Sequence, residues 1–64
     1  MSTVKRIRNN WWNNRGCDYF ESDQFDMAVF HFHNALILDP DNQVIRRNYE
    51  LASLMRKKEE MSTK

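Results

Sequence analysis

The side chains of this sequence that could support chemistry are one cysteine and two histidines. His31 and His33 are two residues apart, so on a helix they would point ~200° away from each other. Two ligands to one metal on a helix need a spacing of three or four residues, and Cys17 is the only cysteine. We therefore expect both histidines at the surface, no metal, no cofactor and no Cys–His nucleophile pair.

Basic residues beside two tryptophans suggest a second kind of chemistry. Lys5, Arg6 and Arg8 precede Trp11 and Trp12, and cations next to aromatic rings suit a single-stranded nucleic acid. The net charge of only +1 argues against this, because domains that bind nucleic acids carry a clear basic excess. An RNA or single-strand DNA accessory factor is thus the less favoured alternative from another functional class.

Length and composition limit the class of protein further. A chain of 64 residues buries only about 60% of its surface on folding, and it cannot build the walls of an enzyme cleft of ~300 Å³. We expect no enzyme and no small-molecule substrate. One glycine and one proline are too few for the many turns of a β protein, so the fold class is all-α.

The cysteine count and the hydropathy pattern bear on the compartment. A single cysteine forms no internal disulfide, which favours a reducing, cytoplasmic setting. The longest apolar runs are too short to span a membrane, so no membrane partner is expected. Charge is unevenly distributed, since residues 1–15 carry four basic groups and no acidic one, whereas residues 16–42 carry six acidic groups and no basic one.

Apolar residues at spacings of three and four predict three helices. The first starts at Val4 or Asn9 and ends at Glu21, which makes residues 1–8 a basic N-terminal extension of helix one. Ser22 or Asp23 is expected to cap the second helix, because their short side-chain oxygens accept bonds from free backbone N–H groups.

The second helix covers about residues 24–38, because Pro40 disfavours helical geometry in the residue before it. Asp41 or Asn42 can then cap a third helix over residues 43–60. Residues 61–64 are expected to be a frayed tail.

Large and small side chains alternate in a fixed order between Trp12 and Pro40. The predicted structural core consists of Trp12, Gly16, Tyr19, Phe25, Ala28, Phe32, Ala35, Leu36 and Pro40. This order resembles the tetratricopeptide repeat (TPR), a helix–turn–helix unit with the pattern W-x2-L-G-x2-Y…A-x3-F…P. The resemblance makes residues 9–42 one repeat and residues 43–60 a capping helix of the kind that closes such arrays. Arg15 departs from the pattern, which usually has leucine or another apolar residue there.

The resemblance implies a groove lined by the first helix and the capping helix. Its candidate residues are Asn10, Asn13, Asn14, Cys17, Phe20, Arg47, Asn48 and Leu51, and the family register also turns Glu21 and Val44 toward it. Asparagine side chains both donate and accept hydrogen bonds, so those at 13, 14 and 48 could bind the backbone of an extended peptide. Arg47 could add a carboxylate contact. The competing interpretation is that these are solvated polar residues.

Cys17 has two interpretations of its own. It is a small apolar filler near the helix crossing, or it is an exposed thiol that links two chains under oxidation. A clamp for a terminal carboxylate, known in some family members, is not expected, because only Asn14 and Asn48 match it.

The second helix carries another apolar stripe, on the side opposite Phe32 and Ala35. This stripe consists of Met27, Phe30, Asn34 and Ile37, and the family register places Trp11 on or near the same exposed side. The five residues are the candidate partner or dimer interface. Repeat units bury such faces by stacking on neighbours, and about three units are normally needed. This sequence contains one.

Three explanations of this stripe compete: self-association, docking on a different protein, and tolerated surface hydrophobes. We expect a homodimer, since small domains often need oligomerisation to be stable. The predicted function is a non-catalytic protein-interaction or assembly adaptor. The alternative within that class is a small regulatory or inhibitory protein that docks on one partner enzyme.

Overall fold

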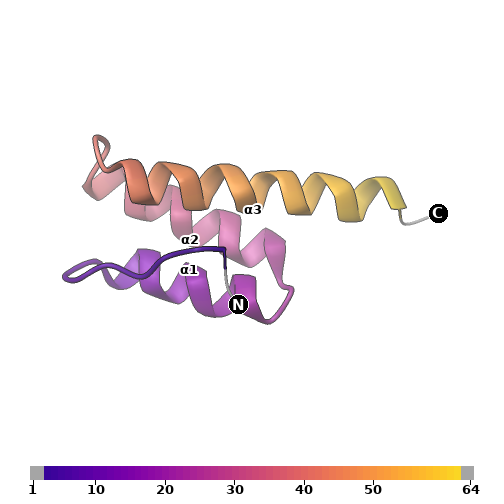
Figure 1. Cartoon of the computed structure of the whole chain (residues 1–64), viewed down its shortest axis with the longest axis horizontal. Helices are drawn as coiled ribbons and strands as arrows, with labels where there is room; N and C mark the ends of the chain where they lie inside the picture. Colours follow the sequence, from indigo (N-terminus) through magenta and orange to yellow (C-terminus); the bar gives the residue numbers. More distant parts are fainter. Residues whose placement is uncertain (1–2, 63–64) are drawn as a thin grey trace.

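Three helices make up the computed structural model, which describes residues 3–62. They are α1 (Trp11–Glu21), α2 (Phe25–Leu38) and α3 (Gln43–Ser62). α1 and α2 form an antiparallel hairpin, and α3 packs against α2 on the other side (Figure 1). No strand occurs within residues 3–62. The all-α fold class and the hairpin followed by a third helix are thereby confirmed.

The α1–α2 crossing depends on one glycine. A Cβ atom added at Gly16 would lie 2.5 Å from Cε1 of Phe32, far inside van der Waals contact. Phe32 is fully buried, as are Ala28 and Ala35 on the same face of α2. Small residues at the crossing therefore bring the two helices close enough to enclose the Phe32 ring.

The other predicted core residues are buried to different degrees. Phe25 is buried, whereas Trp12, Tyr19 and Leu36 are half-buried. Pro40 is exposed, so its assignment to the core was wrong. It lies in the turn between α2 and α3, away from the helix crossing at Phe32.

Both turns that flank α2 are closed by local hydrogen bonds. Asn42 caps α3, since its Oδ1 accepts the backbone N–H groups of Val44 (2.9 Å) and Ile45 (3.2 Å). At the other turn the expected cap is absent, because Gln24 occupies the N-cap position of α2 without a side-chain bond.

The hydrogen bonds of the first turn cap the C-terminus of α1 and not the N-terminus of α2. Asp23 adopts a left-handed conformation with φ of 62°, and the Gln24 N–H reaches back to the Tyr19 carbonyl at 2.9 Å. The Asp23 N–H bonds to the Phe20 carbonyl. This pair of bonds is a Schellman motif, and it explains why the expected cap by Ser22 or Asp23 was wrong.

α1 starts later than the sequence suggested. Residues 3–10 are not helical, so the prediction of an N-terminal extension of helix one was wrong for the described residues. Residues 3–8 instead lie antiparallel to α1, in the space between α1 and α3 (Figure 1). We call residues 3–8 the strap.

Two asparagines reverse the chain between the strap and α1. Asn9 has a positive φ of 65°, a conformation that asparagine tolerates better than most residues. Asn10 Oδ1 then accepts the Asn13 N–H at 3.0 Å and caps α1. The turn and the cap together prevent the helix from continuing toward residue 3.

At the other end, α3 runs beyond the predicted limit. Met61 and Ser62 are helical, whereas the rest of the predicted frayed tail, residues 63–64, lies outside the described residues, as do residues 1–2 of the predicted extension. No helix in the described part of the chain is both long and apolar enough to cross a membrane.

Candidate peptide groove and exposed aromatic face

The groove between α1 and α3 is lined by three asparagine side chains. Asn13 and Asn14 come from α1, and Asn48 comes from α3. Asn48 Nδ2 donates to Asn13 Oδ1 at 2.8 Å, and Asn13 Nδ2 donates to Asn14 Oδ1 at 3.2 Å. The three amides therefore form one connected network across the groove, and Asn13 and Asn48 are almost fully buried in it.

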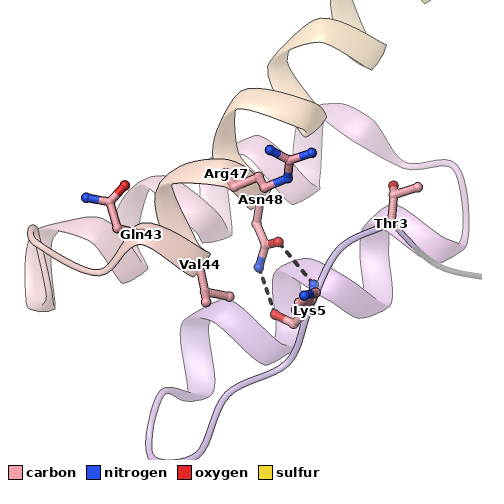
Figure 2. A pocket seen from close by; sticks show the side chains of 6 residues that line it. All are labelled: Thr3, Lys5, Gln43, Val44, Arg47 and Asn48. Atoms are coloured by element: carbon pink, nitrogen blue, oxygen red, sulfur yellow. Dashed lines mark hydrogen bonds between the residues drawn. The ribbon is translucent and has the colours of Figure 1, made fainter.

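The strap is bound to this network through its backbone. The Lys5 N–H donates to Asn48 Oδ1 at 3.0 Å, and the Lys5 carbonyl accepts from Asn48 Nδ2 at 2.8 Å (Figure 2). Asn13 Nδ2 donates to the same carbonyl at 3.0 Å. Both backbone groups of Lys5 are thus satisfied by groove side chains.

Two residues along, the same arrangement is repeated. The Ile7 N–H donates to Asn14 Oδ1 at 2.9 Å, and the Ile7 carbonyl accepts from Asn14 Nδ2 at 2.8 Å. In an extended chain, residues two apart turn their backbone groups to the same side. The asparagines therefore bind the backbone of an extended segment, as the sequence suggested, and the segment belongs to this same chain.

Side chains of the strap contact the groove as well. Val4 is buried in the core beside Cys17 and Ala52. Arg6 forms ion pairs with Asp18 and Glu21 on α1, at 3.1 Å for Glu21. The hydrogen bonds that Arg6 donates to the carboxylates of Glu21 and Asp18 hold the pKa of its guanidinium above its ordinary value.

The remaining predicted groove residues serve several purposes. Asn10 caps α1 and does not contribute to the asparagine network. Phe20 packs edge-on against Phe25, with ring centroids 5.2 Å apart, and Leu51 is half-buried against the core. Arg47 is exposed.

Beside the strap lies an open hollow of about 190 Å³. Figure 2 shows its lining, which consists of Thr3, Lys5, Gln43, Val44, Arg47 and Asn48. The hollow continues the groove along the first turns of α3, and the positively charged Arg47 side chain lies at the edge of the hollow.

Cys17 is fully buried, so the alternative of an exposed, chain-linking thiol was wrong. Burial raises the pKa of the Cys17 thiol to about 11, because the apolar surroundings disfavour the thiolate. Asn13 Nδ2 lies 4.0 Å from its sulfur. The side chain fills the space between the groove and the helix crossing.

The outer face of the hairpin lies away from the groove and carries apolar residues that are exposed. Trp11 is 61% exposed, Phe30 54% and Ile37 65%. Met27 is more weakly exposed, and Asn34 donates an amide hydrogen to the Phe30 carbonyl of its own helix. We call these five residues the outer face.

Trp12 connects the two helices of the outer face. Its ring lies 5.2 Å from the Trp11 ring and 6.2 Å from the Phe30 ring, edge-on in both cases. Arg15, the residue that departs from the repeat pattern, lies over the rings of Trp11 (5.8 Å) and Tyr19 (5.4 Å). Its guanidinium thereby covers aromatic surface where the pattern has an apolar side chain.

The two histidines differ. His33 is exposed, as expected, but His31 is buried, so its placement at the surface was wrong. The His31 ring lies between Trp12 (5.3 Å) and Tyr19 (4.8 Å), and its Nδ1 lies 2.9 Å from the Met27 carbonyl. The described residues contain no group of His, Cys, Asp or Glu side chains that could hold a metal ion.

The sequence pattern did not assign three residues to the groove: Val4, Arg6 and Asp18. They lie outside the periodic pattern that located the helices. The Asn9–Asn10 pair is the signal that could have revealed them, since consecutive asparagines before a helix are typical of a turn followed by a cap.

Comparison with known proteins agrees with this geometry. The family model for the tetratricopeptide repeat matches residues 10–42, a range that covers α1, α2 and the turn after them. No curated protein and no solved structure was found to match the chain. Repeats of this family generally mediate protein–protein interaction and are generally non-catalytic. Because the match covers just over half of the 64 residues, the chain belongs to the tetratricopeptide repeat family.

Proposed function

We propose that this chain is a non-catalytic assembly adaptor that self-associates through its outer face. The observation that carries the proposal is the contrast in exposure within one small molecule. The strap covers the groove, whereas Trp11, Phe30 and Ile37 are each more than half exposed. The ring of Trp12 joins those of Trp11 and Phe30, and exposed apolar surface that is contiguous is typical of protein contact sites.

A second copy is the occupant that the fold favours. Repeat units of this family bury their faces on neighbouring units, and residues 10–42 are one unit. Two copies related by a two-fold axis would each present Trp11 and Phe30 to the other, which is the isologous contact of most homodimers. Each copy would then serve the other as the neighbouring unit that covers its outer face.

Sedimentation velocity tests this proposal, on the wild type and on two aspartate variants. Phe30→Asp introduces a charge on the outer face, and Leu54→Asp introduces the same charge on α3. The two side chains are matched, since both are 54% exposed. At ~100 µM we expect a dimer for the wild type and Leu54→Asp and a monomer for Phe30→Asp, because dimerisation follows mass action.

Other outcomes are equally clear. A monomeric wild type at this concentration, with helical content intact by circular dichroism, would overturn self-association. A different result would favour the alternative function. If the wild type is monomeric and captures one partner enzyme, and Phe30→Asp abolishes that capture, then the chain is a regulatory protein that docks on the enzyme through its outer face. The salt dependence of binding distinguishes the nucleic-acid alternative from both protein-contact proposals. Binding of a nucleic acid weakens steeply as the salt concentration rises, whereas an apolar protein contact does not.

A further inference from the structure

We propose that the strap is an intramolecular ligand of the groove and that it excludes peptides from other proteins until it is released. The peptide that the groove selects has an apolar residue, then any residue, then arginine or lysine. Release of the strap opens the groove to such a peptide from another protein. This inference does not depend on self-association, because it concerns the opposite side of the hairpin.

The first step is recognition of the backbone. Five hydrogen bonds of 2.8–3.0 Å join Lys5 and Ile7 backbone groups to Asn13, Asn14 and Asn48. Asparagine side chains that bind the backbone N–H and C=O groups of a peptide do not distinguish among the peptide's side chains. Any segment that lies extended in the groove can make the same five bonds, so this part of the site fixes register and direction but not sequence.

The second step is selection by two strap side chains, the buried Val4 and the ion-paired Arg6, whose side chain is 46% exposed. Ile7 is half-buried and takes part through its backbone. Val4 is 5% exposed and packs among Cys17, Val29 and Ala52, so its site accepts an apolar group. Arg6 meets the carboxylates of Asp18 and Glu21, so its site accepts a cation. Lys5, between them, is exposed and contributes its backbone. The resulting pattern is apolar–x–basic.

The third step is competition through the tether. The turn at Asn9–Asn10 joins the strap directly to α1, and a short connection holds a ligand at a high effective concentration. A free peptide must therefore displace the strap. Weakening the strap alone, with the groove left unchanged, should strengthen binding of a peptide in trans.

Fluorescence anisotropy with the full chain tests this directly. The probe is a labelled peptide with the sequence of residues 3–9, Thr-Val-Lys-Arg-Ile-Arg-Asn. In Arg6→Glu the strap faces Asp18 and Glu21 with a like charge, while the groove keeps its own residues. We expect the probe to bind this variant about tenfold or more tightly than the wild type, because it no longer competes with a tethered ligand.

Two matched controls isolate the effect. Lys5→Glu makes the same charge change at the neighbouring exposed residue and should bind the probe as the wild type does. A second probe with glutamate in place of its first arginine should fail to bind Arg6→Glu. Circular dichroism verifies that both variants keep their helices, and Val4→Ser offers a second way to loosen the strap.

The contrary results are distinct. Equal affinity of the probe for wild type and Arg6→Glu, or no binding to either loosened variant, would overturn the proposal. So would exchange of the Lys5 and Ile7 amide hydrogens in the wild type at the rate of an unfolded peptide, since the strap would then not occupy the groove. Measurements in the Phe30→Asp background keep these results separate from any dimerisation.

Discussion

The two sides of the hairpin differ in how far the rest of the chain covers them. In the groove, buried asparagines and the apolar core are covered by the strap of the same chain. On the outer face, tryptophan, phenylalanine and isoleucine side chains are left exposed. Both sides are surfaces that a longer repeat array would use for contact. The difference shows that residues 3–8 satisfy the polar groove from within the chain, whereas no part of the described chain covers the apolar outer face.

Hydrogen bonding explains why the groove is the side that is covered. Within the described residues, no buried side-chain nitrogen or oxygen lacks a hydrogen-bond partner. An amide network buried without partners would cost about 1–3 kcal/mol for each orphaned group, whereas an exposed apolar side chain is tolerated in water. A short segment therefore stabilises the chain most where it satisfies backbone and amide groups together.

The largest expected effect compares two phenylalanines of α2. Phe32→Ala should cost ~3–5 kcal/mol and unfold a chain of this size, since the ring is fully buried at the helix crossing. Phe30→Ala, on the outer face, should change the free energy of unfolding of the monomer by only about 0.5 kcal/mol or less. Thermal denaturation followed by circular dichroism measures both. Similar losses would show that the outer face is packed, not open.

A second pair compares asparagines on the two sides. Asn48→Ala removes three hydrogen bonds to Lys5 and Asn13 and should cost about 1–3 kcal/mol. Asn34→Ala removes one exposed bond to its own helix and should be close to neutral. Urea denaturation gives both values. A neutral Asn48→Ala would mean that the strap contributes nothing to stability.

The turn that delivers the strap gives a third comparison, at a single position. Asn9 has a φ of 65°, which costs a residue with a Cβ branch more than it costs glycine. Asn9→Val should destabilise the chain by about 1–2 kcal/mol, whereas Asn9→Gly should be nearly neutral. If valine were tolerated as well as glycine, the strap would not need this turn. The unfolding midpoints of the two variants in urea decide the matter.

The smallest effect, taken over one pH unit, is a pH dependence at the base of the groove. Burial raises the pKa of Cys17 to about 11 from 9.0, so the unfolded chain loses this proton first. The stability that Cys17 contributes is therefore present below pH 9 and declines between pH 9 and 11. The decline should be on the order of 1 kcal/mol for each pH unit within that window.

Comparison with Cys17→Ala isolates this contribution from other groups that titrate at alkaline pH. The free energy of unfolding of the variant should fall less steeply above pH 9 than that of the wild type. Parallel slopes would show that the thiol is not shielded from water.

The sequence by itself determined the three helices and their order. Helical periodicity located α2 to within a residue, and the spacing of Gly16, Ala28 and Phe32 predicted the close crossing. These features depend on local spacing, because residues three and four apart share a helix face. The resemblance to the tetratricopeptide repeat placed the asparagines at 13, 14 and 48 in the groove, and binding of a peptide backbone was one of the two interpretations that their chemistry left open.

Only the tertiary structure decided which backbone they bind. The bonds between Lys5 and Asn48 join residues 43 positions apart, and no periodicity links such distant positions. The same holds for Arg6 with Asp18 and Glu21. It also holds for His31, whose ring lies against Trp12 and Tyr19 of α1. Spacing along one helix predicts its faces, but the neighbour that covers a face is fixed when the whole chain folds.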